Sequence, residues 1–494
     1  MYFSAHNLKK IRRGLIFLFI LLASTLFAAS ENISLPDFGD SAGSVISPSY
    51  ERRLGQMFLK QVRHFSTIIN DPEVESYIQS LGYDLSSHSD NTEQPFTFFV
   101  IDNPTINAFA GPGGMIGINS GVILNSESES ELAGVVAHEI AHVTQRHLAR
   151  TFEEAKKYSL PTAAAMIGAI IIATQDPAAG QAAITSIAGF NIQNQINFTR
   201  ENEEEADRIG INLLAKSGYD PLGMPLFFER LQKLSKFSQS NAPEFFRTHP
   251  LTTSRIADSI ARAESYPKKN YENSHAYELI RYKLLAKTIK KPREAILFLR
   301  DRLEKHEGST SKKLPIRYGL AYAYLLDGAY AHANQQIKRL LKNDMNDAAY
   351  LLLAAKLKTE QSKYDDAFVI FKKAYELYPD YKPVIMAYAR ALVDVGRAEE
   401  ARNIMKNYER HHSHDLNSYA LLGQAESMLG NEIETAILQS EYYYLAGETK
   451  LAVEKLKFIK QRYKMDYYQE QSVSARLSEP VSYTHLTLPT ICSV

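Results

Sequence analysis

The chain has 494 residues, which is enough for two to four domains of ordinary size. Hydrophobic residues make up 45% of it and charged residues 23%, a composition typical of globular proteins that excludes disorder over the whole length. Lys and Arg number 56, as do Asp and Glu, and this balance argues against a nucleic-acid-binding protein, which usually carries a basic excess. The single cysteine, Cys492, excludes an internal disulfide and a cysteine-rich metal site.

The first thirty residues are typical of a secretory signal peptide. Basic residues lie between Lys9 and Arg13, an uncharged apolar run extends from Gly14 to Phe27, and small residues follow it. The apolar run is shorter than the ~20 residues that span a bilayer. We therefore expect residues 1–30 to direct the protein to the periplasm, with residues 31–48 as a linker. The alternative is an inner-membrane protein that the apolar run anchors.

The next segment predicts helices around a short β-rich region. Glu51 to Phe65 and Pro72 to Leu85 carry apolar residues at helical spacing. Residues 96–124 are β-branched and aromatic, and their Gly and Pro breaks at 103–104 and 111–114 predict three short strands. We expect a small sheet among helices.

Two longer helices and an apolar segment follow. Ser128 and Glu131 match a capping box, which predicts that a long helix begins there. A second helix is predicted over about 198–216. Between these helices, residues 160–190 are rich in Ala and Ile and predict a buried or capping helical hairpin. The alternative for this segment is a surface that contacts the membrane or a membrane-protein partner.

The string His138-Glu139-Ile140-Ala141-His142 lies within the first of these helices. Residues four apart on a helix lie ~40° apart around its axis, so both imidazoles can reach one metal ion. Glu139 is rotated by ~100° from His138, a position from which its carboxylate can take a proton from a metal-bound water. This is the zincin arrangement. The surrounding residues are apolar, and burying these polar groups without a cation would be costly.

The third ligand must come from elsewhere. His147 lies nine residues after His138, on the opposite side of a continuous helix, so we reject it as a ligand and expect it at the surface. Residues 201–205 contain several glutamates on the second predicted helix, followed by Asp207. One of these carboxylates would complete two His and one Glu, with a fourth position open for water, as catalytic zinc prefers. The pattern alone does not choose among the glutamates.

The HExxH string and the later string R-x-x-E-x-E-A-D-x-x-G at 200–210 resemble the gluzincin peptidase family that includes HtpX, the Oma-type mitochondrial proteases and the CAAX prenyl proteases. Residues 107–109 with 112–114 also resemble that family. The resemblance implies that Glu203 is the third zinc ligand. It marks Asp207 as an active-site acid that orients a zinc-binding histidine or donates a proton.

The string Thr248-His249-Pro250 also recurs in this family, as does Ser254-Arg255-Ile256. The resemblance implies an active-site role for His249. Its imidazole would either bind the transition-state oxyanion or occupy the open zinc position in a latent state.

From about residue 273 the chain resembles a tetratricopeptide repeat, with a 34-residue period in three columns. Small residues in two columns would let paired helices pack closely. We predict a repeat domain over 273–475, with 276–305 and 419–462 as degenerate flanking units, and a non-native tail at 480–494 that gives Cys492 no functional weight. The columns are Ala333, Ala367 and Ala401; Ala321, Ala355, Ala389 and Gly423; and Ile337, Phe371 and Met405.

We thus expect an α+β, zincin-type peptidase domain over 49–270, mostly helical with a small β-sheet, followed by an all-α superhelix of repeats. This organisation is similar to that of periplasmic proteases of Gram-negative bacteria that act on outer-membrane β-barrel proteins. The resemblance implies one Zn²⁺ per chain, misassembled outer-membrane proteins as substrates, and the β-barrel assembly machinery as partner of the repeats. An extended substrate would pair with an edge strand near 106–110. The alternative function is a repeat chaperone or adaptor with a vestigial or latent peptidase domain.

Overall fold

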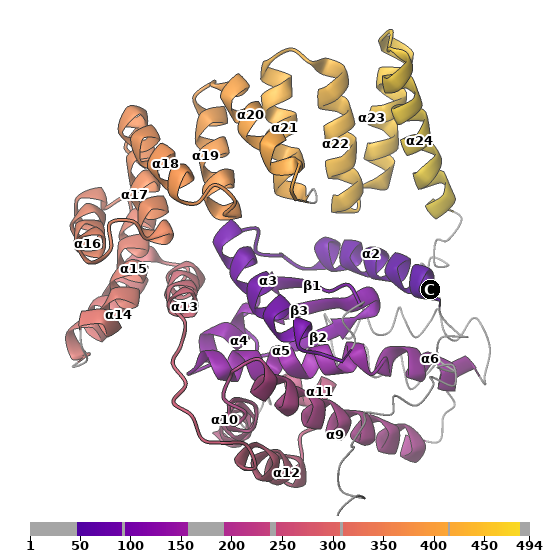
Figure 1. The fold of residues 1–494 in the computed structure, drawn as a ribbon, viewed down its shortest axis with the longest axis vertical. Coiled ribbons are helices and arrows are strands. Elements are labelled where there is room, and N and C mark those ends of the chain that lie inside the picture. Colours follow the sequence, from indigo (N-terminus) through magenta and orange to yellow (C-terminus); the bar gives the residue numbers. More distant parts are fainter. Residues whose placement is uncertain are drawn as a thin grey trace, which may run out of the picture. The chain divides into compact units, whose positions relative to one another are not determined.

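The computed structural model describes residues 47–90, 94–156, 192–237, 244–306, 310–412 and 415–484. The predicted signal peptide, nearly all of the predicted linker, the 160–190 segment and the last ten residues of the predicted tail lie outside these ranges. The described part is mostly helical and contains one three-stranded sheet, which confirms the predicted fold class (Figure 1). None of its helices is both long enough and apolar enough to cross a membrane.

The sheet is built from strands β1 (Thr97–Ile101), β2 (Ala108–Gly111) and β3 (Met115–Asn119). Its order is β1-β3-β2, with β1 parallel and β2 antiparallel to the central β3. The three strands confirm the prediction, and β2 is an edge strand as expected. The turn before β3 requires glycine, because Gly114 has a φ of 74° and a Cβ there would overlap the carbonyl oxygen of Pro95.

Helices surround this sheet and form what we call the N-terminal core, which comprises α2 to α12. Two of them begin with Pro at the first turn, where its missing N–H costs nothing. The helices are α2 (Pro48–Phe65), α3 (Pro72–Ser87), α4 (Ser120–Asn125), α5 (Glu129–Thr144), α6 (His147–Lys156), α9 (Ile192–Lys216), α10 (Gly223–Phe237), α11 (Phe245–Thr248) and α12 (Thr253–Glu264).

Helix α5 begins where the sequence predicts, but its cap differs in one detail. The Ser128 hydroxyl accepts a hydrogen bond from the Glu131 N–H at 3.2 Å. The Glu131 carboxylate accepts from the N–H of Glu127 at 2.8 Å, one residue before the cap. The predicted hydrogen bond to the Ser128 hydroxyl is therefore present, whereas the Glu131 carboxylate binds the backbone of Glu127 and not that of Ser128.

Helix α5 is the centre of the N-terminal core and is buried around most of its circumference. Val135, Val136 and Ile140 are fully buried, and the helix packs against β2 and β3 on one side and α9 and α10 on others (Figure 1). Polar side chains on such a helix need partners, because an isolated buried charge is costly. The histidines and glutamate of α5 must therefore face other polar groups inside the protein.

The C-terminal array comprises α13 to α24, and within its described residues all elements are helices. All ten residues of the predicted columns are buried. The helices are α13 (His275–Thr288), α14 (Pro292–Lys305), α15 (Thr310–Leu326), α16 (Tyr330–Asn343), α17 (Ala348–Glu360), α18 (Tyr364–Leu377), α19 (Lys382–Asp394), α20 (Ala398–Glu409), α21 (Leu416–Met428), α22 (Glu432–Ala446), α23 (Thr449–Arg462) and α24 (Tyr467–Thr484).

Helix α13 contributes to both parts of the structure. Tyr277, Ile280 and Leu284 belong to the same hydrophobic cluster as the residues of α5, and the Tyr277 hydroxyl donates to the Ser126 carbonyl at 2.9 Å. Other residues of α13, such as Tyr282, belong to the first cluster of the array. The domain boundary near residue 273 remains a prediction, and α13, which follows it in the sequence, packs against both parts.

Candidate active site

The two histidines of the HExxH string face one point, as helical spacing predicts. His138 and His142 lie one turn apart on α5, and their Nε2 atoms are 3.0 Å apart. His138 is fully buried and the His142 side chain is 13% exposed. The separation is short enough for both nitrogens to bind the same ion.

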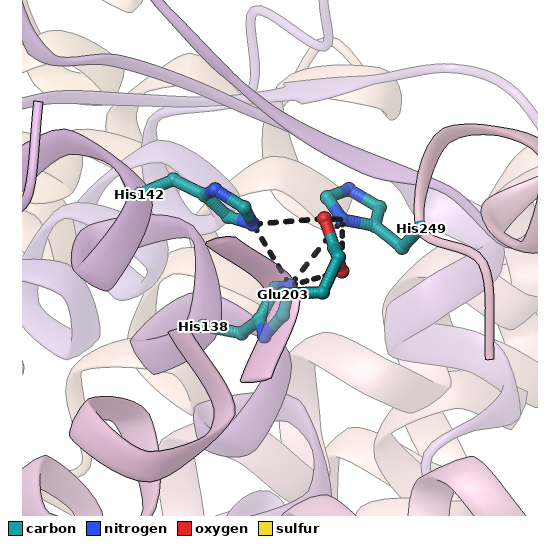
Figure 2. A group of neighbouring side chains, drawn as sticks. All are labelled: His138, His142, Glu203 and His249. Atoms are coloured by element: carbon teal, nitrogen blue, oxygen red, sulfur yellow. Dashed lines mark hydrogen bonds and ion pairs between the residues drawn. The ribbon is translucent and has the colours of Figure 1, made fainter. Parts of the chain in front are cut away.

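Helix α9 and the loop after α11 bring two more groups to this point. Glu203 places one carboxylate oxygen 3.4 Å from His138 Nε2 and the other 3.4 Å from His142 Nε2. His249 caps α11, and its Nδ1 lies 3.0 Å from Glu203 Oε1 and 3.3 Å from His138 Nε2. Figure 2 shows the four side chains pointing toward a common centre.

These four side chains fit a divalent metal ion. Their ligand atoms all lie within 4.8 Å of one another. Ligands at 2.0–2.1 Å from a tetrahedral zinc ion are separated by ~3.3 Å, and the closest separations in this group are 3.0–3.4 Å. Imidazole nitrogens and a carboxylate are the donor types that zinc accepts. The structure thus brings together every ligand that the sequence predicts, with His249 as a fourth.

The ionisation of the two α5 histidines differs. Burial lowers the pKa of His142 to about 3, which leaves the imidazole neutral, as a metal ligand must be. Burial also lowers the pKa of His138, but Asp207 and Glu203 outweigh this effect and raise it to about 10. A metal ion bound here would displace that proton, so metal affinity depends on pH.

Asp207 lies behind His138, one turn after Glu203 on α9. Its Oδ1 is 3.0 Å from His138 Nδ1, the nitrogen that faces away from the common centre. Burial raises the pKa of Asp207, but His138 and Arg255 outweigh this effect and keep it below its ordinary value. The carboxylate is therefore placed to orient the imidazole.

Arg255, on α12, joins the site although the sequence pattern predicts no role for it. Its guanidinium donates two hydrogen bonds of 2.8 Å to the Asp207 carboxylate, and its Nη1 lies 3.1 Å from Glu203 Oε2. One buried cation thus contacts the two buried carboxylates of α9, those of Glu203 and Asp207. The sequence feature that could have pointed to Arg255 is its place in the string Ser254-Arg255-Ile256, which recurs in the family after His249.

Glu139 is fully buried beside the metal-binding group. Within the described residues neither of its carboxylate oxygens makes a hydrogen bond of ordinary geometry, although the backbone of Ala110 on β2 lies near enough to lower its pKa, and His249 Nε2 is 3.4 Å from Oε1. Burial raises the pKa of Glu139, and the imidazoles of His249 and His138 oppose that shift. A carboxylate with free acceptor sites and a raised pKa is suited to accept a proton.

The prediction that His147 lies at the surface is wrong. The side chain is buried, and its Nδ1 is 2.8 Å from His142 Nδ1 while its Nε2 is 3.1 Å from Glu205 Oε2. The prediction assumed a continuous helix, but α5 ends at Thr144 and Arg146 adopts a left-handed φ of 53°. The chain turns there, and α6 begins with His147 directed back toward the site.

A buried HExxH motif joined by a carboxylate from a second helix defines a metallopeptidase. Residues 72–262 match the model of peptidase family M48, and residues 358–425 match a tetratricopeptide repeat.

The chain is 36% identical to the beta-barrel assembly-enhancing protease of Escherichia coli (strain K12) over 447 residues, which cover 90% of this chain and 91% of that protein. The protease of the same name from Yersinia pestis is 31% identical over 445 residues, again 90% of this chain and 91% of that one. The mitochondrial metalloendopeptidase OMA1 of Schizosaccharomyces pombe is 29% identical over 217 residues, 43% of this chain and 60% of the relative. The chain belongs to the M48 family of metallopeptidases, in its branch of beta-barrel assembly-enhancing proteases, and the predicted resemblance is confirmed.

Proposed function

We propose that this protein is a periplasmic zinc endopeptidase that acts in the quality control and assembly of outer-membrane β-barrel proteins. The observation that carries the proposal is the set of ligand atoms of His138, His142 and Glu203, placed 3.0–3.4 Å apart with Glu139 beside them. The names of the Escherichia coli and Yersinia pestis relatives support the role in β-barrel assembly. The signal-peptide pattern of residues 1–30 supports the periplasm.

The positions of the residues support the following proposed roles. Zinc bound by the two histidines and Glu203 would polarise the scissile carbonyl and make a water molecule easier to deprotonate. Glu139 takes a proton from the attacking water and delivers it to the leaving amine. Asp207 holds His138 in the orientation that binding requires. An extended substrate pairs with the β2 edge, where main-chain hydrogen bonds accept varied sequences.

The partners are proteins. Misassembled outer-membrane proteins are the proposed substrates, and the C-terminal array is proposed to bind the β-barrel assembly machinery, since helical repeats offer extended surfaces for docking. A contact of the 160–190 segment with the membrane stays a prediction, because that segment lies outside the described residues.

A conservative change at Glu139 tests the catalytic assignment. Glu139→Gln should lower hydrolysis of an unfolded peptide by ~10²–10⁴-fold, because the amide cannot accept the proton, while zinc content stays at one per chain. Glu204→Gln is the matched control, since Glu204 is exposed on α9. Metal analysis and peptide cleavage with and without a chelator are the measurements. Undiminished cleavage by the Glu139→Gln variant would refute the assignment.

The alternative function, a chaperone or adaptor with latent peptidase activity, is favoured by one observation. His249 Nδ1 lies 3.3 Å from His138 Nε2, among the atoms proposed to bind the ion, where it would compete with a substrate or water. We propose that His249 is a latent fourth ligand. His249→Ala should then raise cleavage of a short peptide, by about tenfold if the closed state outweighs the open one tenfold. A fall in cleavage with zinc retained would indicate transition-state binding, and no change in either quantity would reject gating.

A further inference from the structure

His142 has a partner on its far side that comes from a different element. His147, at the start of α6, lies with its Nδ1 2.8 Å from His142 Nδ1. The two rings meet edge to face, with centroids 4.9 Å apart. The other ring nitrogen of His147 is 3.1 Å from Glu205 Oε2 on α9, and Arg150 Nη1 lies 3.0 Å from the same oxygen.

His142, His147 and Glu205 form a hydrogen-bonded series, and the carboxylate at its end determines where the protons lie. An ionised carboxylate accepts hydrogen bonds and donates none, so His147 Nε2 carries the proton that it shares with Glu205. A neutral imidazole has one N–H, so the Nδ1 of His147 is an acceptor. The facing Nδ1 of His142 must then be the donor, because two nitrogens 2.8 Å apart share one proton.

We infer that His147 and Glu205 are positioning residues that fix the tautomer of His142, so that the lone pair of its Nε2 faces the metal ion. This inference rests on the proposed function, because it concerns zinc binding at His142. Asp207 supports His138 directly, whereas Glu205 supports His142 through an intervening imidazole. Both imidazoles of the HExxH motif are thus held by carboxylates of α9, the helix that also carries Glu203.

The competing explanation is that His147 and Glu205 only fasten α6 to α9. Two substitutions distinguish the explanations. His147→Leu fills the space but removes the acceptor, whereas His147→Asn keeps an amide oxygen near the position of Nδ1. We expect zinc affinity, measured by competition with a chromophoric chelator, to fall ~10–100-fold in the His147→Leu variant and to recover in the His147→Asn variant. Arg150→Gln is the control, since it leaves both imidazole contacts intact.

A second measurement uses the unaltered chain. Nitrogen NMR of the zinc-bound protein with labelled histidine should assign the proton of His147 to Nε2 and that of His142 to Nδ1. The opposite tautomer of His147 overturns the inference, as does a zinc affinity of the His147→Leu variant within twofold of the unaltered one. In either case zinc binding by the unaltered chain would leave the proposed function standing, whereas an unaltered chain without zinc would remove both.

Discussion

The site is a group of buried charges that stabilise one another at the scale of single residues. Asp207 and Glu203 are both nearly inaccessible to solvent, and Arg255 contacts each of them. Two carboxylates side by side without a cation would repel each other and lose their hydration. The arginine also holds Asp207 with two parallel hydrogen bonds, a geometry that lysine cannot reproduce.

Removing this guanidinium should be costly. Arg255→Met is expected to lower the free energy of unfolding by ~3–5 kcal/mol, because both carboxylates lose a buried counter-charge and keep only the imidazoles as partners, and Arg255→Lys should cause a smaller loss. Arg262→Met on the same helix is the control, with an expected effect below ~1 kcal/mol, because its ion pair with Asp258 is exposed. Urea denaturation of the three variants is the measurement, and equal losses at positions 255 and 262 would contradict the argument.

At the scale of elements, the metal-binding group depends on how closely α9 approaches α5. Gly210 lies at the crossing, where a Cβ would be 3.2 Å from the backbone nitrogen of His138 and 2.6 Å from the methyl group of Met224. Glu203 and Asp207 precede it by seven and three residues on α9. The absent side chain at Gly210 therefore sets the distance across which both carboxylates reach the imidazoles.

A branched side chain at this crossing should separate the helices. Gly210→Val is expected to cost ~1–3 kcal/mol of stability from overpacking and to lower peptide turnover on the order of 10²-fold by displacing Glu203. Gly210→Ala should be milder, because the end of the Met224 side chain can move. Gly423→Ala in the array is the control matched to Gly210→Ala, since its Cβ would meet Leu438 at an ordinary 3.6 Å. Full zinc content and turnover in the Gly210→Val variant would reject this explanation.

At the scale of the whole molecule, buried and partly buried charges join the N-terminal core to the C-terminal array. Lys283 of α13 lies between Asp71, at 2.8 Å, and Glu73 at the start of α3. The Tyr318 hydroxyl of α15 donates to Glu73 at 3.1 Å. Further along the array, Lys382 Nζ is 2.7 Å from Glu75 Oε1. We expect the core and the first helices of the array to unfold together.

The Lys283 contact makes stability sensitive to acid. Burial raises the pKa of Asp71, but Lys283 and Lys287 outweigh it and hold the pKa below its ordinary value. The unfolded chain then binds the proton more readily, so this stabilisation is present above pH ~4 and is lost as pH falls through the folded pKa. Asp71→Asn should flatten this part of the stability curve while keeping the helix cap, because Asn caps as well as Asp.

Urea midpoints between pH 7 and pH 3 measure this effect. Lys283→Met should in addition lower the free energy of unfolding at pH 7 by ~3–5 kcal/mol, because Glu73 loses its cation and Asp71 keeps only Lys287, at 3.6 Å. An acid dependence that is the same in the Asp71→Asn variant and the unaltered chain would contradict the assignment to Asp71.

Local patterns in the sequence were sufficient for much of the fold and for part of the site. Helical spacing placed His138 and His142 on one face, and the 34-residue period identified columns that are all buried. Both inferences concern neighbours along one helix or between adjacent repeats, where geometry is fixed by 3.6 residues per turn. The choice of Glu203 among adjacent glutamates needed the family resemblance, because an acidic run has no period that marks one member.

The tertiary structure decided what no local pattern contains. The turn at Arg146 directs His147 inward, and the crossing of α9, α12 and α5 brings Arg255 to a carboxylate 48 residues away. The packing of α13 against the N-terminal core is likewise a contact between distant elements that no local pattern predicts. Side-chain periodicity records which face of an element is buried, but it does not record which distant element covers that face. That choice depends on the direction of turns and on how closely helices approach one another.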